Sequence, residues 1–159
     1  MTLYCPTAIT VSENSEKDVN IDFAIVGANW LIDASISKSA NDNDILSGMT
    51  DFVRAKEFSS VFVKLPRRTG NTEVAIQTAI RHQPSMILTT TKHNTKDIIN
   101  RLKLENIRSV PVKTLDSSFY RYKKDFSKTT VVVDNASTVD TDKFNILYSL
   151  GAKFYVFVG

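Results

Sequence analysis

The sequence predicts an α/β domain with a mostly parallel sheet that helices cover on both faces. Four apolar runs rich in β-branched or aromatic residues are typical of buried strands, at residues 61–65, 86–90, 129–134 and 154–158. Segments with helix-compatible composition separate them. Buried strands that alternate with helices favour a parallel sheet, because each crossover helix covers one of its faces.

The N-terminal part carries the weakest signals. Residues 1–20 are expected to be an irregular lead-in. A short apolar run at residues 23–26, ended by a glycine, predicts a strand, and residues 35–44, rich in Ser, Asn and Asp, predict a loop. We therefore expect residues 1–42 to form a lead-in that packs on the core of an α/β domain of residues 43–159.

From Asp44 the pattern becomes helical, because the apolar residues from Ile45 to Val53 fall on one helix face. Either Asn43 or Asp44 can cap the start of this helix.

Two further helices are predicted at residues 72–81 and from a cap at Asn94, followed by a short strand at 109–112. Apolar residues within 144–150 indicate a last helix, which Gly151 can terminate.

Composition narrows the setting. Apolar residues make up 42% and charged residues 23% of 159 residues, which is ordinary for a globular domain. The single cysteine, Cys5, cannot form an internal disulfide, and no apolar run approaches the length of a membrane span. We expect no membrane association and a location in the cytoplasm, or in the host cytoplasm if the protein is viral.

Charge is distributed unevenly along the chain. Residues 1–51 hold eight acidic and two basic residues, a net −6, whereas the remainder is +9. A basic region of this size suits the phosphates of a nucleotide or nucleic acid. The alternative is a solvated, lysine-rich surface that the acidic segment neutralises.

A candidate phosphate-binding loop follows the strand at residues 61–65 and precedes a helix. Its sequence is Leu65-Pro66-Arg67-Arg68-Thr69-Gly70-Asn71-Thr72-Glu73. A P-loop uses glycine so that backbone N–H groups converge on phosphate, a lysine for the outer phosphates and a hydroxyl for Mg²⁺. Gly70 and Thr72 match the glycine and the hydroxyl, but Asn71 replaces the lysine. Charge could come from Lys64, Arg67 or Arg68, and the alternative is an exposed turn before a helix.

A second candidate element is the strand that ends in Val133-Asp134-Asn135. In P-loop enzymes such a strand ends in an Asp that orients Mg²⁺, often followed by a Glu that polarises the attacking water. Asp134 fits the first role. Asn135 stands at the position of the Glu and cannot act as a base. The alternative is that Asp134 only caps a turn.

Together these elements resemble the additional-strand P-loop ATPases of RecA-like type, within them the motor domains of phage terminase large subunits and superfamily 2 helicases. The segment from Pro66 to Thr72 is similar to the terminase pattern Pro-Arg-Arg-x-Gly-Lys-Thr. The resemblance spans residues 43–159 and implies ATP and Mg²⁺ as cofactors. It implies nucleotide contacts from Arg67, Arg68, Gly70, Asn71 and Thr72, metal contacts from Thr72 and Asp134, and a catalytic position at Asp134 and Asn135.

Asn71 and Asn135 each remove a functional group that the family uses. We therefore expect a stand-alone domain with weak or absent hydrolysis that acts by binding nucleic acid or a protein partner, either with ATP and Mg²⁺ or with no cofactor. The alternative is an active ATPase with a variant loop, in which Arg67 or Arg68 replaces the lysine, within a helicase or DNA-packaging system. A third interpretation is an interaction module whose basic surface docks to an acidic partner.

Overall fold

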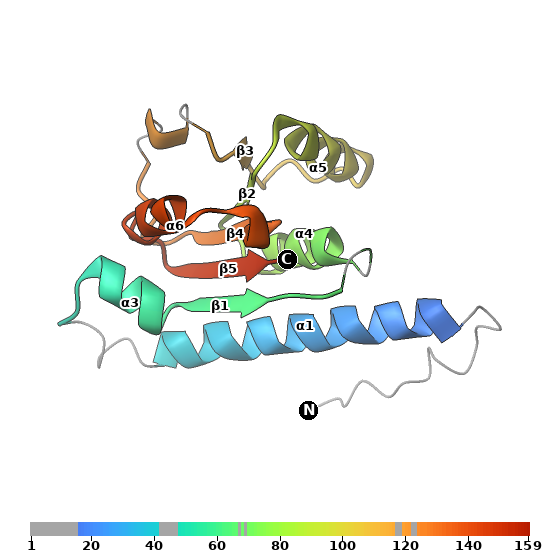
Figure 1. Cartoon of the computed structure of the whole chain (residues 1–159), viewed down its shortest axis with the longest axis horizontal. Coiled ribbons are helices and arrows are strands. Elements are labelled where there is room, and N and C mark those ends of the chain that lie inside the picture. The colour runs from blue at the N-terminus through green and yellow to red at the C-terminus, as the bar shows by residue number, and fades with distance from the viewer. Residues whose placement is uncertain (1–15, 42–47, 67, 69, 117–118, 122–123) are drawn as a thin grey trace.

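One five-stranded sheet forms the centre of the protein (Figure 1). A computed structural model describes residues 16–41, 48–66, 68, 70–116, 119–121 and 124–159. The described strand pairs are all parallel, and β5 lies between β1 and β4 in the spatial order β1-β5-β4-β2-β3. The strands are β1 (Ser60–Val63), β2 (Ser85–Thr89), β3 (Val112–Thr114), β4 (Thr130–Asp134) and β5 (Phe154–Val158).

Helices cover both faces of this sheet. Buried residues of α1, α4 and α5 share one core with the sheet, and buried residues of α3 and α6 share a second core on the other face. The α/β prediction is confirmed, and the architecture is consistent with the RecA-like type. The helices are α1 (Glu16–Asn41), α3 (Asp51–Glu57), α4 (Asn71–Arg81), α5 (Lys92–Leu104) and α6 (Thr141–Tyr148), with short 3-10 turns η2 (Phe119–Arg121) and η3 (Ala136–Thr138).

The inner strands β2, β4 and β5 are buried along their whole length. Their alternating side chains enter the two cores in turn. Val132 and Val156 pack with α1 and α4, whereas Val133 and Phe157 pack with α6. A strand buried on both faces needs a continuous apolar run, which explains why these strands could be predicted from the sequence.

The secondary structure predicted for the N-terminal part was wrong where the structure describes it. Residues 16–41, expected to be a lead-in, a strand and a loop, form the single helix α1. Residues 1–15 lie outside the described residues, as do Asn43 and Asp44, the candidate caps. Figure 1 shows α1 running alongside β1 at one end of the sheet.

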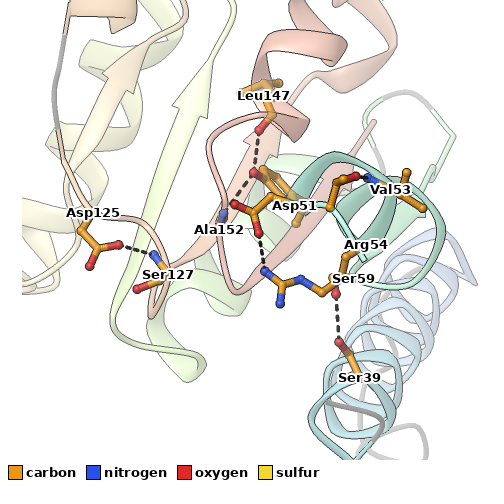
Figure 2. A network of polar contacts seen from close by, with 11 residues as sticks. Ser39, Asp51, Val53, Arg54, Ser59, Asp125, Ser127, Leu147 and Ala152 are labelled. Atoms are coloured by element: carbon orange, nitrogen blue, oxygen red, sulfur yellow. Dashed lines mark hydrogen bonds and ion pairs between the residues drawn. The ribbon is translucent and has the colours of Figure 1, made fainter. Parts of the chain in front are cut away.

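One side of α1 is built into the core. Ala28, Ile32 and Ile36 are buried at four-residue spacing, so they lie on one helix face. The buried hydroxyl of Ser39 shares a 3.2 Å hydrogen bond with Ser59 just before β1 (Figure 2). Asp33 accepts hydrogen bonds from Arg81 at 3.0 Å and pairs with His82 at 2.6 Å, at the end of α4.

Several element boundaries differ from the prediction because of their caps. The hydroxyl of Thr50 caps α3 and that of Thr91 caps α5, so these helices begin at Asp51 and Lys92. The predicted strand at 109–112 appears later, as β3. Helix α6 ends at Tyr148, with Ser149 rather than Gly151 as its C-cap. Among the described helices, none has the length and apolar character that crossing a membrane requires.

Candidate functional site

A pocket of about 840 Å³ opens where β1, β4 and β5 end, at the carboxyl edge of the sheet. This is the edge at which open parallel sheets bind ligands. The predicted residues Arg68, Gly70, Asn71, Thr72, Asp134 and Asn135 all line it. Arg67 lies outside the described residues. The structure therefore brings together residues that are more than 60 positions apart in the sequence.

Asn71 is the first residue of α4, and its side chain turns back to the strand end. Its amide Oδ1 accepts a 2.9 Å hydrogen bond from the Leu65 N–H, and its Nδ2 donates a 3.1 Å hydrogen bond to the Leu65 carbonyl. Both ends of the amide are thus engaged by one residue. One N–H of the Nδ2 amide group is committed to Leu65, which leaves the second N–H as the donor for a phosphate.

Thr72 and Asp134 form the contact across the pocket. The Thr72 hydroxyl donates a 3.2 Å hydrogen bond to Oδ2 of Asp134, which is only 3% exposed. Burial raises the pKa of Asp134, while the Thr72 hydrogen bond, the Asn135 main-chain amide and the charge of Arg101 oppose that rise. A carboxyl group that lines a pocket and whose charged form is disfavoured by burial is typical of a functional site.

Asn135 adopts a left-handed backbone conformation with φ of 59°. Asparagine tolerates this conformation better than most residues, which gives it a backbone reason to stand at the end of β4. The chain is crowded there, because a Cβ added at Gly159 would lie 3.2 Å from the Asn135 Cα. Asn135 thus contributes a main-chain amide to Asp134 and a neutral side chain to the pocket.

Arg101 is one of the pocket residues that the sequence did not predict. It projects from α5, pairs with Glu73 in the first turn of α4 and lies close enough to Asp134 to influence its pKa. The exposed cations Lys64 and Arg68 also line the pocket. No local motif surrounds Arg101, so only the approach of α5 to α4 reveals it.

The pocket fits Mg²⁺ held together with a phosphate ligand better than a metal held by the protein alone. The described residues contain no cluster of three or more His, Cys, Asp or Glu side chains that could hold a metal ion. Thr72 and Asp134 offer a hydroxyl and a carboxylate. Magnesium typically takes one or two such ligands and completes its shell with water and substrate phosphates.

Comparisons with protein-family models, with curated proteins and with solved structures found no match to this chain.

Proposed function

We propose that this chain is a P-loop-type domain that binds a nucleoside triphosphate with Mg²⁺ but hydrolyses it slowly or not at all, and that it acts as a binding module. The observation that carries the proposal is the pair of hydrogen bonds between Asn71 and Leu65, next to an intact Thr72–Asp134 contact. The first replaces a phosphate-binding lysine with a structural clamp. The second keeps the ligands that Mg²⁺ would use.

The binding half of the proposal rests on the shape and charge of the pocket. Gly70, with φ of 104°, precedes the N-terminus of α4, where main-chain N–H groups and the helix dipole favour an anion. Lys64, Arg68 and Arg101 add positive charge to the lining. A pocket of about 840 Å³ lies within the range of small-ligand sites.

The part of the proposal that concerns weak hydrolysis rests on the contacts that the carboxylates in the pocket already make. Within the described pocket lining, each carboxylate already has a partner: Glu73 pairs with Arg101, Asp97 with His93 and Asp134 with Thr72. Asn135 stands where a catalytic base is expected and has no basic group. None of these groups is poised to activate a water.

Calorimetric titration with ATP, ADP and AMP, with and without Mg²⁺, tests the proposal alongside a phosphate-release assay. We expect Mg²⁺-dependent ATP binding that Asp134→Ala weakens and Asp142→Ala, an exposed control in α6, leaves unchanged. The turnover number of the wild type for ATP hydrolysis should be below about 1 s⁻¹, the lower end of the range for typical enzymes.

Faster turnover that Asp134→Ala abolishes would instead establish the alternative, an active ATPase in which Arg67 or Arg68 replaces the lysine. Absence of binding by any of the three nucleotides at millimolar concentration would contradict the proposal.

The binding module would act on a nucleic acid or a protein partner in the cytoplasm. Titration with single- and double-stranded DNA and RNA at two salt concentrations distinguishes the two classes, because phosphate contacts weaken steeply with salt. Salt-sensitive binding supports a nucleic acid. If no such binding to DNA or RNA is found, the result favours a protein as the partner.

A further inference from the structure

The P-loop interpretation leaves a deficit of charge where the phosphates would lie. Asn71 is neutral and its amide is bound to Leu65. A nucleoside triphosphate carries more negative charge than one Mg²⁺ neutralises, and an uncompensated charge in a pocket is costly, so a cationic side chain is also needed. The cation must therefore come from elsewhere in the lining.

Arg101 is better placed than the two loop cations. Lys64 and Arg68 belong to the exposed rim. Arg101 instead lines the pocket together with Thr72 and Asp134, the candidate magnesium ligands. Its guanidinium pairs with Glu73, the residue after Thr72 in α4. An arginine offers several N–H donors in a planar fork that suits phosphate oxygens.

Glu73 now holds this guanidinium. One carboxylate oxygen of Glu73 accepts from Arg101, and the other accepts a 2.8 Å hydrogen bond from Gln77, one turn further along α4. Gln77 in turn accepts a 2.7 Å hydrogen bond from Asn29 of α1. The acid is thus fixed in place, while the Arg101 side chain remains 41% exposed.

An ion pair with this exposure contributes little to stability, because water screens it. A bidentate contact with a polyphosphate is a stronger interaction. Exchange of partners by Arg101 is therefore favourable when such a ligand enters the pocket.

We propose that Arg101 supplies the phosphate contact that the P-loop lysine makes, and that Glu73 holds Arg101 until a nucleoside polyphosphate displaces it. This inference rests on the proposed nucleotide binding and adds to it the residue that replaces the lysine and the acid that competes for it.

Titration of the full chain with ATP and Mg²⁺ tests the proposal. Arg101→Gln should weaken binding about tenfold, the loss expected for one charge-assisted contact. Glu73→Gln should tighten binding about threefold, because the competing carboxylate is gone while an amide oxygen can still accept from Gln77. The double variant should bind no more tightly than Arg101→Gln alone.

Two exposed residues near the end of α5 give matched controls for the change in net charge. Arg108→Gln and Glu105→Gln should leave ATP binding within twofold of the wild type. Arg101→Lys, which keeps the charge but loses the fork, should bind between the wild type and Arg101→Gln. It also keeps the test available if Arg101→Gln does not fold.

The opposite signs of the two substitutions are the decisive result. A pair that only ties α4 to α5 predicts that both substitutions act alike, and this outcome overturns the inference. If the wild type binds ATP and Arg101→Gln binds it equally well, the inference fails while the proposed function stands. If neither the wild type nor Glu73→Gln binds ATP, both fail. Binding that appears only in Glu73→Gln, and is lost again in the double variant, would show that ATP does not displace Glu73 from Arg101 in the wild type, and would also overturn the inference.

Discussion

The side-chain amide of Asn71 hydrogen-bonds to both main-chain groups of Leu65, six residues earlier in the chain. This contact closes the loop between β1 and α4 on itself. A lysine at the same position cannot reproduce it, because an ammonium group donates but does not accept. In the proposed P-loop, Asn71 therefore takes the place of a phosphate-binding lysine and also gives the loop a contact that holds it in shape.

Stability should depend on this clamp. Asn71→Ala leaves the part-buried N–H and carbonyl of Leu65 without these partners, so the free energy of unfolding should fall by about 1–3 kcal/mol. Asn71→Asp keeps the acceptor and loses the donor, so its free energy of unfolding should lie between that of the wild type and that of Asn71→Ala. Urea unfolding of the three proteins measures the differences. A loss below about 0.5 kcal/mol for Asn71→Ala would show that the loop does not need the clamp.

Asn71→Lys links the clamp to binding. We expect this variant to lose stability as Asn71→Ala does, and to bind ATP with Mg²⁺ about tenfold more tightly than the wild type, because one charged contact is restored. Asn145→Lys adds the same charge on the exposed surface of α6 and serves as the control. An unchanged affinity for ATP in Asn71→Lys would argue against the P-loop interpretation of this segment.

The Asp134 carboxylate should lower the stability of the folded protein and at the same time contribute to the binding of ATP with Mg²⁺. Burial raises its pKa, so the folded state holds the carboxylate at a cost at neutral pH. Asp134→Asn removes the charge and keeps an oxygen for the Thr72 hydroxyl, so the free energy of unfolding should rise by on the order of 1 kcal/mol. Binding of ATP with Mg²⁺ should be lost. Asp142→Asn, at an exposed site, controls for net charge. A destabilised variant that still binds ATP would make Asp134 a structural residue.

The sheet was predictable because strands buried on both faces need continuous apolar segments, as in the Val131–Val133 run of β4. Helix α1 was not predictable in the same way. Its apolar residues occupy two sides, with Ile32 buried while Trp30 is 70% exposed. They therefore give no single helical stripe. Ser39 belongs to a stretch that resembles a loop in composition, yet its hydroxyl is buried against Ser59.

The candidate site was predictable where it follows local motifs. Gly70, Thr72 and Asp134 each stand next to a recognisable strand end or helix start, and the structure places all three in one pocket. Side-chain partners are set by tertiary contacts instead. The sequence does not show that Asn71 turns to Leu65, nor that Arg101 reaches Glu73 across two helices.

Alkaline pH should destabilise the protein through Tyr155. Its buried hydroxyl donates to the Leu147 carbonyl at 2.5 Å and accepts from the Ala152 N–H at 3.2 Å, and burial raises its pKa to about 12. Figure 2 shows Leu147 and Ala152 facing each other across this contact. Between pH 10 and 12 the folded state retains a proton that the unfolded state has lost.

The contribution of the Tyr155 hydroxyl to the free energy of unfolding is fully present below pH 10 and is lost as the pH rises through about 12. The loss is at most about 2.7 kcal/mol. Tyr155→Phe should lack that part of the pH dependence, whereas the ionisation of Tyr148 remains in both proteins. Urea unfolding at several alkaline pH values measures the difference curve. Parallel curves for the two proteins would show that Tyr155 does not titrate with folding.

Helix α1 should support the loop before α4 through a contact between Ile25 and Gly70. Gly70 has φ of 104°, and a Cβ at this position would lie 2.7 Å from Cδ1 of Ile25. Gly70→Ala therefore adds backbone strain and a close contact, and should lower the free energy of unfolding by about 1–3 kcal/mol. Ile25→Val removes Cδ1 and should itself cost about 0.5–1.5 kcal/mol.

The double variant separates the two causes. Because the smaller side chain makes room for the new methyl group, the combined loss should be less than the sum of the single losses by at least about 0.5 kcal/mol. What remains reflects the left-handed backbone and the 3.0 Å approach of Cγ1, which valine keeps. Gly27→Ala makes the same chemical change inside α1, where nothing approaches an added Cβ, and should stabilise the protein by about 1 kcal/mol. Strict additivity in the double variant would mean that Ile25 does not restrict the loop, and that α1 supports the pocket only through its contacts with α4.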